Sequence, residues 1–201
     1  MKILLLFFLS QFSFFALAEE SLVDHPLLLI EPSFTRPEIS QLISGAQRTI
    51  IVAGLMDKNA SGEITVSFLH PSWESTKQKK MTRFVKEARS NLSQVLATLH
   101  PRFIRDEHHV IQVAILESSN PITASTILAP DFPEQFVNIF GPDLLIAIPS
   151  AHRIYVFSKL ASPLNDIAST IRDDYQISSA PLSTEIFQLS HGELRAVGSL
   201  D

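Results

Sequence analysis

The sequence predicts a single α+β domain, and two observations support this class. Short apolar runs typical of strands occur in pairs, and a brief polar turn separates the members of each pair, as in β-hairpins. Segments with apolar residues at three- and four-residue spacing, which predict helices, interrupt these pairs without the regular strand-helix alternation of a parallel sheet. We therefore expect a mixed or mostly antiparallel sheet with helices packed on one face.

The first 18 residues have the order of a secretory signal peptide. Lys2 supplies a positive charge, residues 3–15 are mainly apolar, and Ala16-Leu17-Ala18 is a cleavage motif of small residues. The apolar stretch is shorter than the roughly 20 residues of a membrane-spanning helix. We expect cleavage after residue 18 and a domain of residues 19–201 without a membrane span, located in the periplasm or secreted from a bacterial cell.

Composition excludes several classes of function. The chain has 21 acidic and 16 basic residues, for a net charge of −5, which argues against nucleic acid as a partner. It has no cysteine, so neither a lipoprotein anchor nor a disulfide can form, and the exported domain must depend on apolar burial. Its six glycines are scattered and form no phosphate-binding loop, so we expect no nucleotide cofactor.

The first half of the chain predicts a helix between short strands. After an apolar run at 27–30, Pro37 suits the first turn of a helix, and Gly45 is its natural end. Apolar positions then predict a hairpin of residues 49–55 and 63–69, followed by a long helix at 81–99. They further predict a buried strand at 110–116, an extended segment at 122–128 and a short helix at 131–141.

The last third predicts two further hairpins and one helix. The first hairpin turns at Ser150-Ala151-His152, and the second turns at His191-Gly192. Between them, a helix begins at Ser162-Pro163 and repeats apolar residues on one side. The predicted strands are residues 143–149, 153–159, 184–189 and 193–197.

Basic residues gather at the start of the long helix. Four of them form a candidate surface for an anionic partner: Lys79, Lys80, Arg83 and Lys86. A phospholipid headgroup, an acidic glycan or an acidic protein face would suit such a strip. The alternative is the ordinary polar side of an amphipathic helix, which Glu74 and Glu87 favour because they dilute the positive charge.

Histidines offer the main candidate for catalysis. Imidazole side chains could hold zinc or another divalent metal, and the candidates are His70, His100, His108 and His109. Neighbouring His108 and His109 on a strand would point to opposite faces, so one of them at most could join a given site. The alternative is a solvated strand entry before the predicted strand at 110–116.

Covalent catalysis lacks a sequence motif. There is no G-x-S-x-G turn and no cysteine nucleophile. A Ser-His-Asp arrangement would have to come from unmarked positions such as Ser150, His152 and His191, all in predicted turns. The adjacent carboxylates Asp173 and Asp174 would not face each other on a helix.

The C-terminal half resembles a bacterial family. The segments that carry the resemblance are Ile127-Leu128-Ala129-Pro130, Phe140 to Pro149, Arg153 to Phe157, and a closing hairpin from Leu182-Ser183 to Val197. They are similar to the YtpQ-like family, whose role is undefined. The resemblance implies an α+β fold and supplies no catalytic residue.

These observations favour a non-enzymatic exported domain that binds an unidentified protein or envelope component, without a cofactor. The alternative is an exported hydrolase or metal-dependent enzyme that uses His70, His100, His108 or His109.

Overall fold

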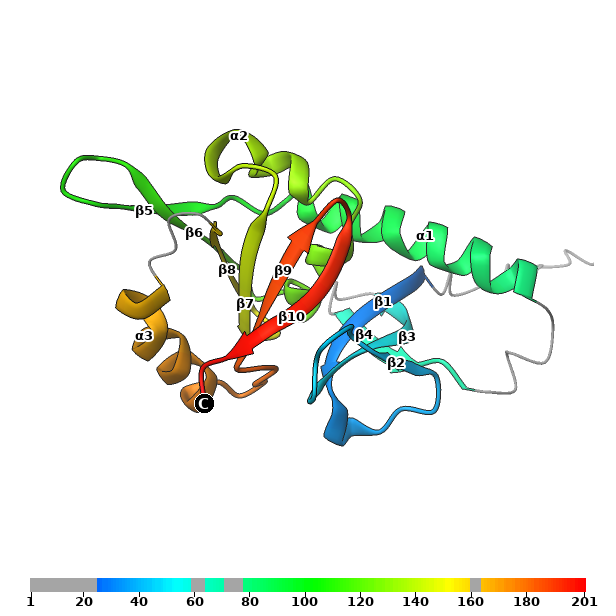
Figure 1. Ribbon diagram of the computed structural model, residues 1–201. Coiled ribbons are helices and arrows are strands. Elements are labelled where there is room, and N and C mark those ends of the chain that lie inside the picture. The colour runs from blue at the N-terminus through cyan, green and yellow to red at the C-terminus, as the bar shows by residue number, and fades with distance from the viewer. Residues whose placement is uncertain (1–24, 59–63, 71–77, 160–163) are drawn as a thin grey trace, which may run out of the picture.

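The computed structural model describes residues 25–58, 64–70, 78–159 and 164–201 of the chain. Within these ranges, antiparallel sheets and helices confirm the predicted α+β class (Figure 1). The predicted signal peptide at residues 1–18 lies outside the described residues. None of the described helices has the length and apolar character needed to cross a membrane.

The smaller sheet is formed by the first third of the chain. Its central strand β3 pairs with β1 along one edge, and β2 and β4 share the other edge. The predicted hairpin is confirmed as β3 with β4. The strands are β1 (His25–Pro32), β2 (Ser40–Leu42), β3 (Thr49–Lys58) and β4 (Ile64–Phe68).

The helix expected between Pro37 and Gly45 does not form. A 3-10 turn, η1 (Ser33–Thr35), ends at Arg36, whose φ of 48° is left-handed and interrupts any helix at that point. The following residues form β2 instead. Pairing with the open edge of β3 satisfies their backbone groups, so tertiary hydrogen bonding overrides the local helix signal.

The larger sheet has the antiparallel order β10-β9-β7-β8-β6-β5. The two predicted hairpins are confirmed as β7 with β8 and β9 with β10, whereas β5 was not predicted. In Figure 1 the β5-β6 hairpin projects away from the body of the sheet. The strands are β5 (Arg102–Arg105), β6 (Ile111–Glu117), β7 (Leu144–Ser150), β8 (Arg153–Ser158), β9 (Glu185–Ser190) and β10 (Glu193–Ser199).

The helices lie on both faces of the larger sheet, although one face was expected. Helix α3 (Leu164–Ile177) covers one face, where Ile171 packs with Tyr155 and Phe157. The opposite face belongs to another apolar cluster that includes Phe140 of the short α2 (Val137–Phe140), whereas the long helix α1 (Gln78–Leu96) packs mainly on β1 and on residues 124–128. Strand residues alternate between the faces, so apolar residues throughout β7 and β8 require cover on both sides.

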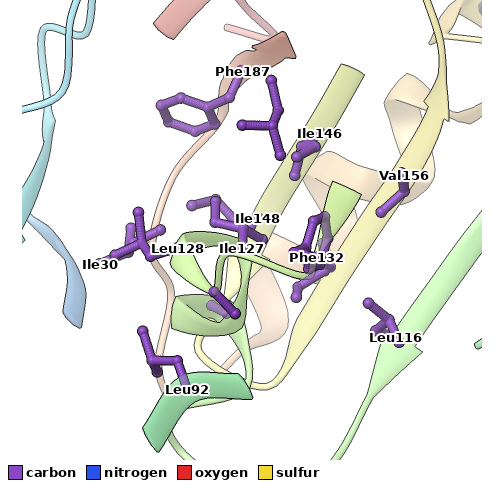
Figure 2. Packing of buried hydrophobic residues seen from close by; sticks show 14 of the residues in the cluster. Ile30, Leu92, Leu116, Ile127, Leu128, Phe132, Ile146, Ile148, Val156 and Phe187 are labelled. Atoms are coloured by element: carbon purple, nitrogen blue, oxygen red, sulfur yellow. The ribbon is translucent and has the colours of Figure 1, made fainter. Parts of the chain in front are cut away.

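Residues 122–128 were expected to be extended, but they contain a buried 3-10 helix, η3 (Ala124–Leu128). Local hydrogen bonds favour the turn, because the hydroxyls of Thr123 and Thr126 donate to backbone carbonyls three residues earlier. Figure 2 shows Leu128 of this segment near Ile30 of the smaller sheet. A second 3-10 turn, η4 (Pro133–Gln135), precedes α2. The segment therefore fills the core between the two sheets.

A buried polar cluster also joins the sheets. Glu185 of β9 accepts hydrogen bonds from the Thr49 hydroxyl and from the backbone N–H of Gln47, each with a distance of 2.6 Å. The Thr49 and Ser183 hydroxyl oxygens lie 2.7 Å apart. Because an unpaired buried carboxylate is costly, these contacts favour one relative placement of the sheets.

Candidate functional site

A pocket of about 340 Å³ opens between the two sheets, and we call it the inter-sheet pocket. One wall comes from the smaller sheet and the turn after β1: Leu29, Glu31, Pro32, Phe34, Thr35 and Val66. The other wall comes from three segments of the C-terminal part: Pro121, Ile122, Ala151, Ala180, Pro181 and Leu182. Its volume falls within the range typical of small-ligand sites.

Strand register places the first wall. Leu29 and Glu31 are two residues apart on β1 and therefore share a face of the sheet. Leu29 is opposite Val52, and Val66 of β4 is opposite Met56, four residues farther along β3 on the same face. Leu29, Glu31 and Val66 consequently point toward the same side of the smaller sheet, and Pro32, the last residue of β1, also lines this wall.

Backbone contacts place the second wall. The Ala151 N–H donates to the Ala180 carbonyl at 3.0 Å, and the Leu182 N–H donates to the Pro149 carbonyl at 2.9 Å. These bonds hold residues 180–182 beside the β7-β8 turn. Proline has no N–H, so Pro121 and Pro181 add apolar surface without a donor that would need a partner.

The rim of the inter-sheet pocket exposes apolar side chains. Phe34 is 71% exposed and Val66 is 36% exposed. Phe68, which is 44% exposed, follows Val66 by two residues and shares its face of β4. Exposed apolar side chains that gather around a pocket are a feature of binding sites.

Glu31 is the one ionisable residue among those that line the inter-sheet pocket. It is partly buried, and burial raises the pKa of its carboxyl group above the ordinary value. No hydrogen bond or ion pair joins this carboxylate to another residue in the described part of the chain. A carboxylate in apolar surroundings is stabilised when a donor or a cation approaches it, so Glu31 is the natural polar contact for a ligand.

A second, polar cavity of about 210 Å³ is lined by residues at the β7-β8 turn and at the end of α3. Arg153 forms ion pairs with Glu117 and with Asp174, the latter at 2.6 Å between Nη1 and Oδ2. The Tyr155 hydroxyl donates to the same Asp174 carboxylate. Burial opposes the charge on Arg153, but its hydrogen bonds to Asp174 and Glu117 prevail and raise its pKa. These charged groups satisfy one another and attach α3 to β8.

Comparisons with protein-family models, with curated proteins and with solved structures find no match to this chain.

The candidate nucleophile and histidine pairs do not assemble into a triad. Ser150 and His152 both line the polar cavity, but the buried Nδ1 atom of His152 has no hydrogen-bond partner in the described structure, so no carboxylate orients that ring through Nδ1. At the other hairpin, Ser190 donates to Asp143 at 2.5 Å and lies 2.9 Å from His191 Nδ1. That order places serine between acid and histidine, whereas catalysis needs histidine in the middle.

The four histidines of the enzyme hypothesis lie on separate elements. His70 follows β4, His100 follows α1, and His108 and His109 occupy the β5-β6 turn. Asp106 accepts hydrogen bonds from backbone N–H groups of that turn and stabilises it. Among the described residues, no group of three or more His, Asp or Glu side chains could hold a metal ion. The enzyme hypothesis thus stays a prediction without a described site.

The basic surface is described only in part. Arg83 and Lys86 are exposed on α1, whereas the side chains of Lys79 and Lys80 lie outside the described residues. Arg89, on the same helix, donates from Nε to the Leu128 carbonyl at 3.0 Å, so it has a structural partner. An anionic partner for this strip stays a prediction.

Sequence reasoning missed the inter-sheet pocket because its walls come from segments up to about 150 residues apart in the chain. One local signal was available. Glu31 continues the alternation of Leu27 and Leu29, so an acidic residue stands where the pattern places a side chain on the inward face.

Proposed function

We propose that this protein is an exported, non-enzymatic binding domain and that the inter-sheet pocket is its ligand site. The observation that carries the proposal is the pocket itself: apolar walls held by two sheets, the exposed side chains of Phe34 and Val66 at its rim, and one carboxylate without a partner among the described residues. A mostly apolar cavity with few polar groups is the usual form of a small-ligand site.

Two sequence features support the cellular setting of the proposal. Residues 1–18 have the pattern of a cleavable signal peptide, and the absence of cysteine leaves no lipid anchor at that site. The ligand would then be met in the periplasm or outside the cell. The resemblance of the C-terminal half to the YtpQ-like family, which brings no catalytic residue, agrees with a binding role.

A filled pocket tests the proposal directly. In Ala180→Phe, an aromatic side chain would occupy part of the cavity beside Ala151. The matched control is Val197→Phe, which adds a similar ring at an exposed position on β10. The probe is N-phenyl-1-naphthylamine, an uncharged apolar dye whose fluorescence rises in apolar surroundings.

We expect the purified protein and the Val197→Phe variant to bind the dye, and the Ala180→Phe variant to lose at least about tenfold in affinity. Thermal unfolding of each variant checks that it is folded. Equal dye binding by a folded Ala180→Phe variant, or no binding by the unmodified protein, would overturn the proposal.

A further inference from the structure

We infer that the inter-sheet pocket selects a small organic cation, an apolar body that ends in a protonated amine, with Glu31 as its counter-ion. This inference rests on the proposed function and names the chemical class of its ligand.

The charge of the pocket favours a cationic ligand. Glu31 is the sole ionisable residue in the described lining of the pocket, and no described side chain neutralises its carboxylate. An anionic ligand would place a like charge in the same apolar cavity, which is unfavourable. A neutral ligand would leave the charge uncompensated, whereas an ammonium group would pair with it.

Thr35 supplies a second polar side chain to the described lining. The Thr35 hydroxyl donates to the Pro32 carbonyl at 2.8 Å, so its proton is not available to Glu31. Its oxygen still has a lone pair that can accept a hydrogen bond. An ammonium group carries three N–H donors and no acceptor, which complements a carboxylate and a hydroxyl oxygen.

The size of the pocket suits a small molecule. A cavity of about 340 Å³ fits a ligand of small-molecule size and is too small for a folded protein surface. Apolar contacts with Leu29, Ile122 and Leu182 would hold a hydrocarbon or aromatic body, while Glu31 at the end of β1 would fix its charged end. Apolar area would supply affinity, and the carboxylate would supply selectivity.

The experiment compares three probes of one shape by calorimetry: 4-phenylbutylamine, 4-phenylbutan-1-ol and 4-phenylbutyric acid. We expect the unmodified protein to bind the amine about tenfold more tightly than the alcohol, since a hydrogen bond to a charged group exceeds a neutral one. The acid should bind most weakly.

Two variants separate the carboxylate from general charge. Glu31→Gln should lose the preference and bind the amine about as weakly as the alcohol, a change of about tenfold. Glu38→Gln removes an exposed carboxylate of the same segment that does not line the pocket, and it should keep the preference. Thermal unfolding confirms that both variants are folded.

The outcomes are distinguishable. Equal affinity for amine and alcohol, with both lost in Ala180→Phe, would overturn the cation inference and leave the proposed site intact. Tighter binding of the acid would also overturn it. Self-association that Ala180→Phe abolishes would show that a second copy of the chain covers the pocket, and would overturn it too.

Discussion

Thr49 and Glu185 belong to different sheets, yet the Thr49 hydroxyl donates to the Glu185 carboxylate at 2.6 Å inside the protein. Thr49 is fully buried, and Glu185 is 4% exposed. This hydrogen bond lies at the junction that places the two walls of the inter-sheet pocket opposite each other, so the pocket depends on a polar contact within the core.

Thr49→Val tests that junction. It keeps the shape of the side chain but removes a donor from a buried carboxylate, so we expect the free energy of unfolding to fall by about 1.5–3 kcal/mol. Urea unfolding measures the loss. The control is Thr65→Val, a change at an exposed position of β4 in the same sheet, which should stay within about 0.5 kcal/mol. Equal effects in the two variants would contradict the role of the junction.

Gly45→Ala tests a close approach between the smaller sheet and β10. Gly45 has a φ of 74°, and an added Cβ would lie 2.6 Å from the Ala196 carbonyl oxygen. Gly192 has a similar φ of 79° with nothing within 4 Å, so Gly192→Ala has the same backbone strain without the clash. We expect Gly45→Ala to lower the free energy of unfolding by at least about 1 kcal/mol more than Gly192→Ala. A smaller loss at Gly45, measured in urea, would contradict the contact.

Tyr155→Phe tests the contact between β8 and α3. Loss of the hydrogen bond to Asp174 should reduce the free energy of unfolding by about 1 kcal/mol at neutral pH. Burial, together with this hydrogen bond, raises the pKa of Tyr155 above its ordinary value near 10. Because the pKa of Tyr155 is higher in the folded protein than in the unfolded chain, its contribution to the free energy of unfolding is complete at pH values below the unfolded-state pKa. That contribution declines as the pH rises above the unfolded-state pKa.

The pH dependence of urea unfolding tests this contribution of Tyr155. The unmodified protein should lose stability above about pH 10 more steeply than Tyr155→Phe, because the variant lacks this titration. Parallel curves for the two proteins would show that the Tyr155 hydroxyl is equally free in the folded and unfolded states.

Glu31→Gln tests whether Glu31 is unpaired in the absence of ligand. Burial raises the pKa of Glu31, so the ionised carboxylate weakens the fold as pH rises above the ordinary value of 4.5. The variant should therefore be more stable at pH 7 than the unmodified protein and should show a smaller decline in stability between pH 4 and pH 7. Urea unfolding with Glu38→Gln as control measures both. A loss of stability in Glu31→Gln would mean that the carboxylate has a stabilising partner.

Local patterns predicted the hairpins and the long helix well. The apolar stripe that includes Phe84, Ala88 and Leu92 is buried on α1, and alternating apolar residues specify β9 and β10. The helix predicted between Arg36 and Gly45 is wrong. Both of these residues have positive φ angles, and the segment between them contains β2, which pairs with the edge of β3. The hydrophobic pattern of a segment does not predict which sheet edge it will pair with.

The pocket illustrates the same difficulty. Leu29 and Glu31 are adjacent on one face by local alternation, and this much is readable from the sequence. Their position opposite Ala180 and Leu182 depends on how the two sheets pack, which involves long-range hydrogen bonds such as that from the Thr49 hydroxyl to Glu185. The basic residues from Lys79 to Lys86 stood out in the sequence because they are close together in the chain, whereas the pocket residues are dispersed.

The most direct test of the inter-sheet pocket as the ligand site is a titration of the isotope-labelled protein with 4-phenylbutylamine, followed through backbone amide NMR signals. We expect saturable shifts at Thr35, Ala151 and Leu182, which line the pocket and have amide protons, and loss of these shifts in Ala180→Phe. Shifts confined to Glu117, Asp174 and Ser178 of the polar cavity, or no saturable shift at any residue, would contradict this assignment of the ligand site.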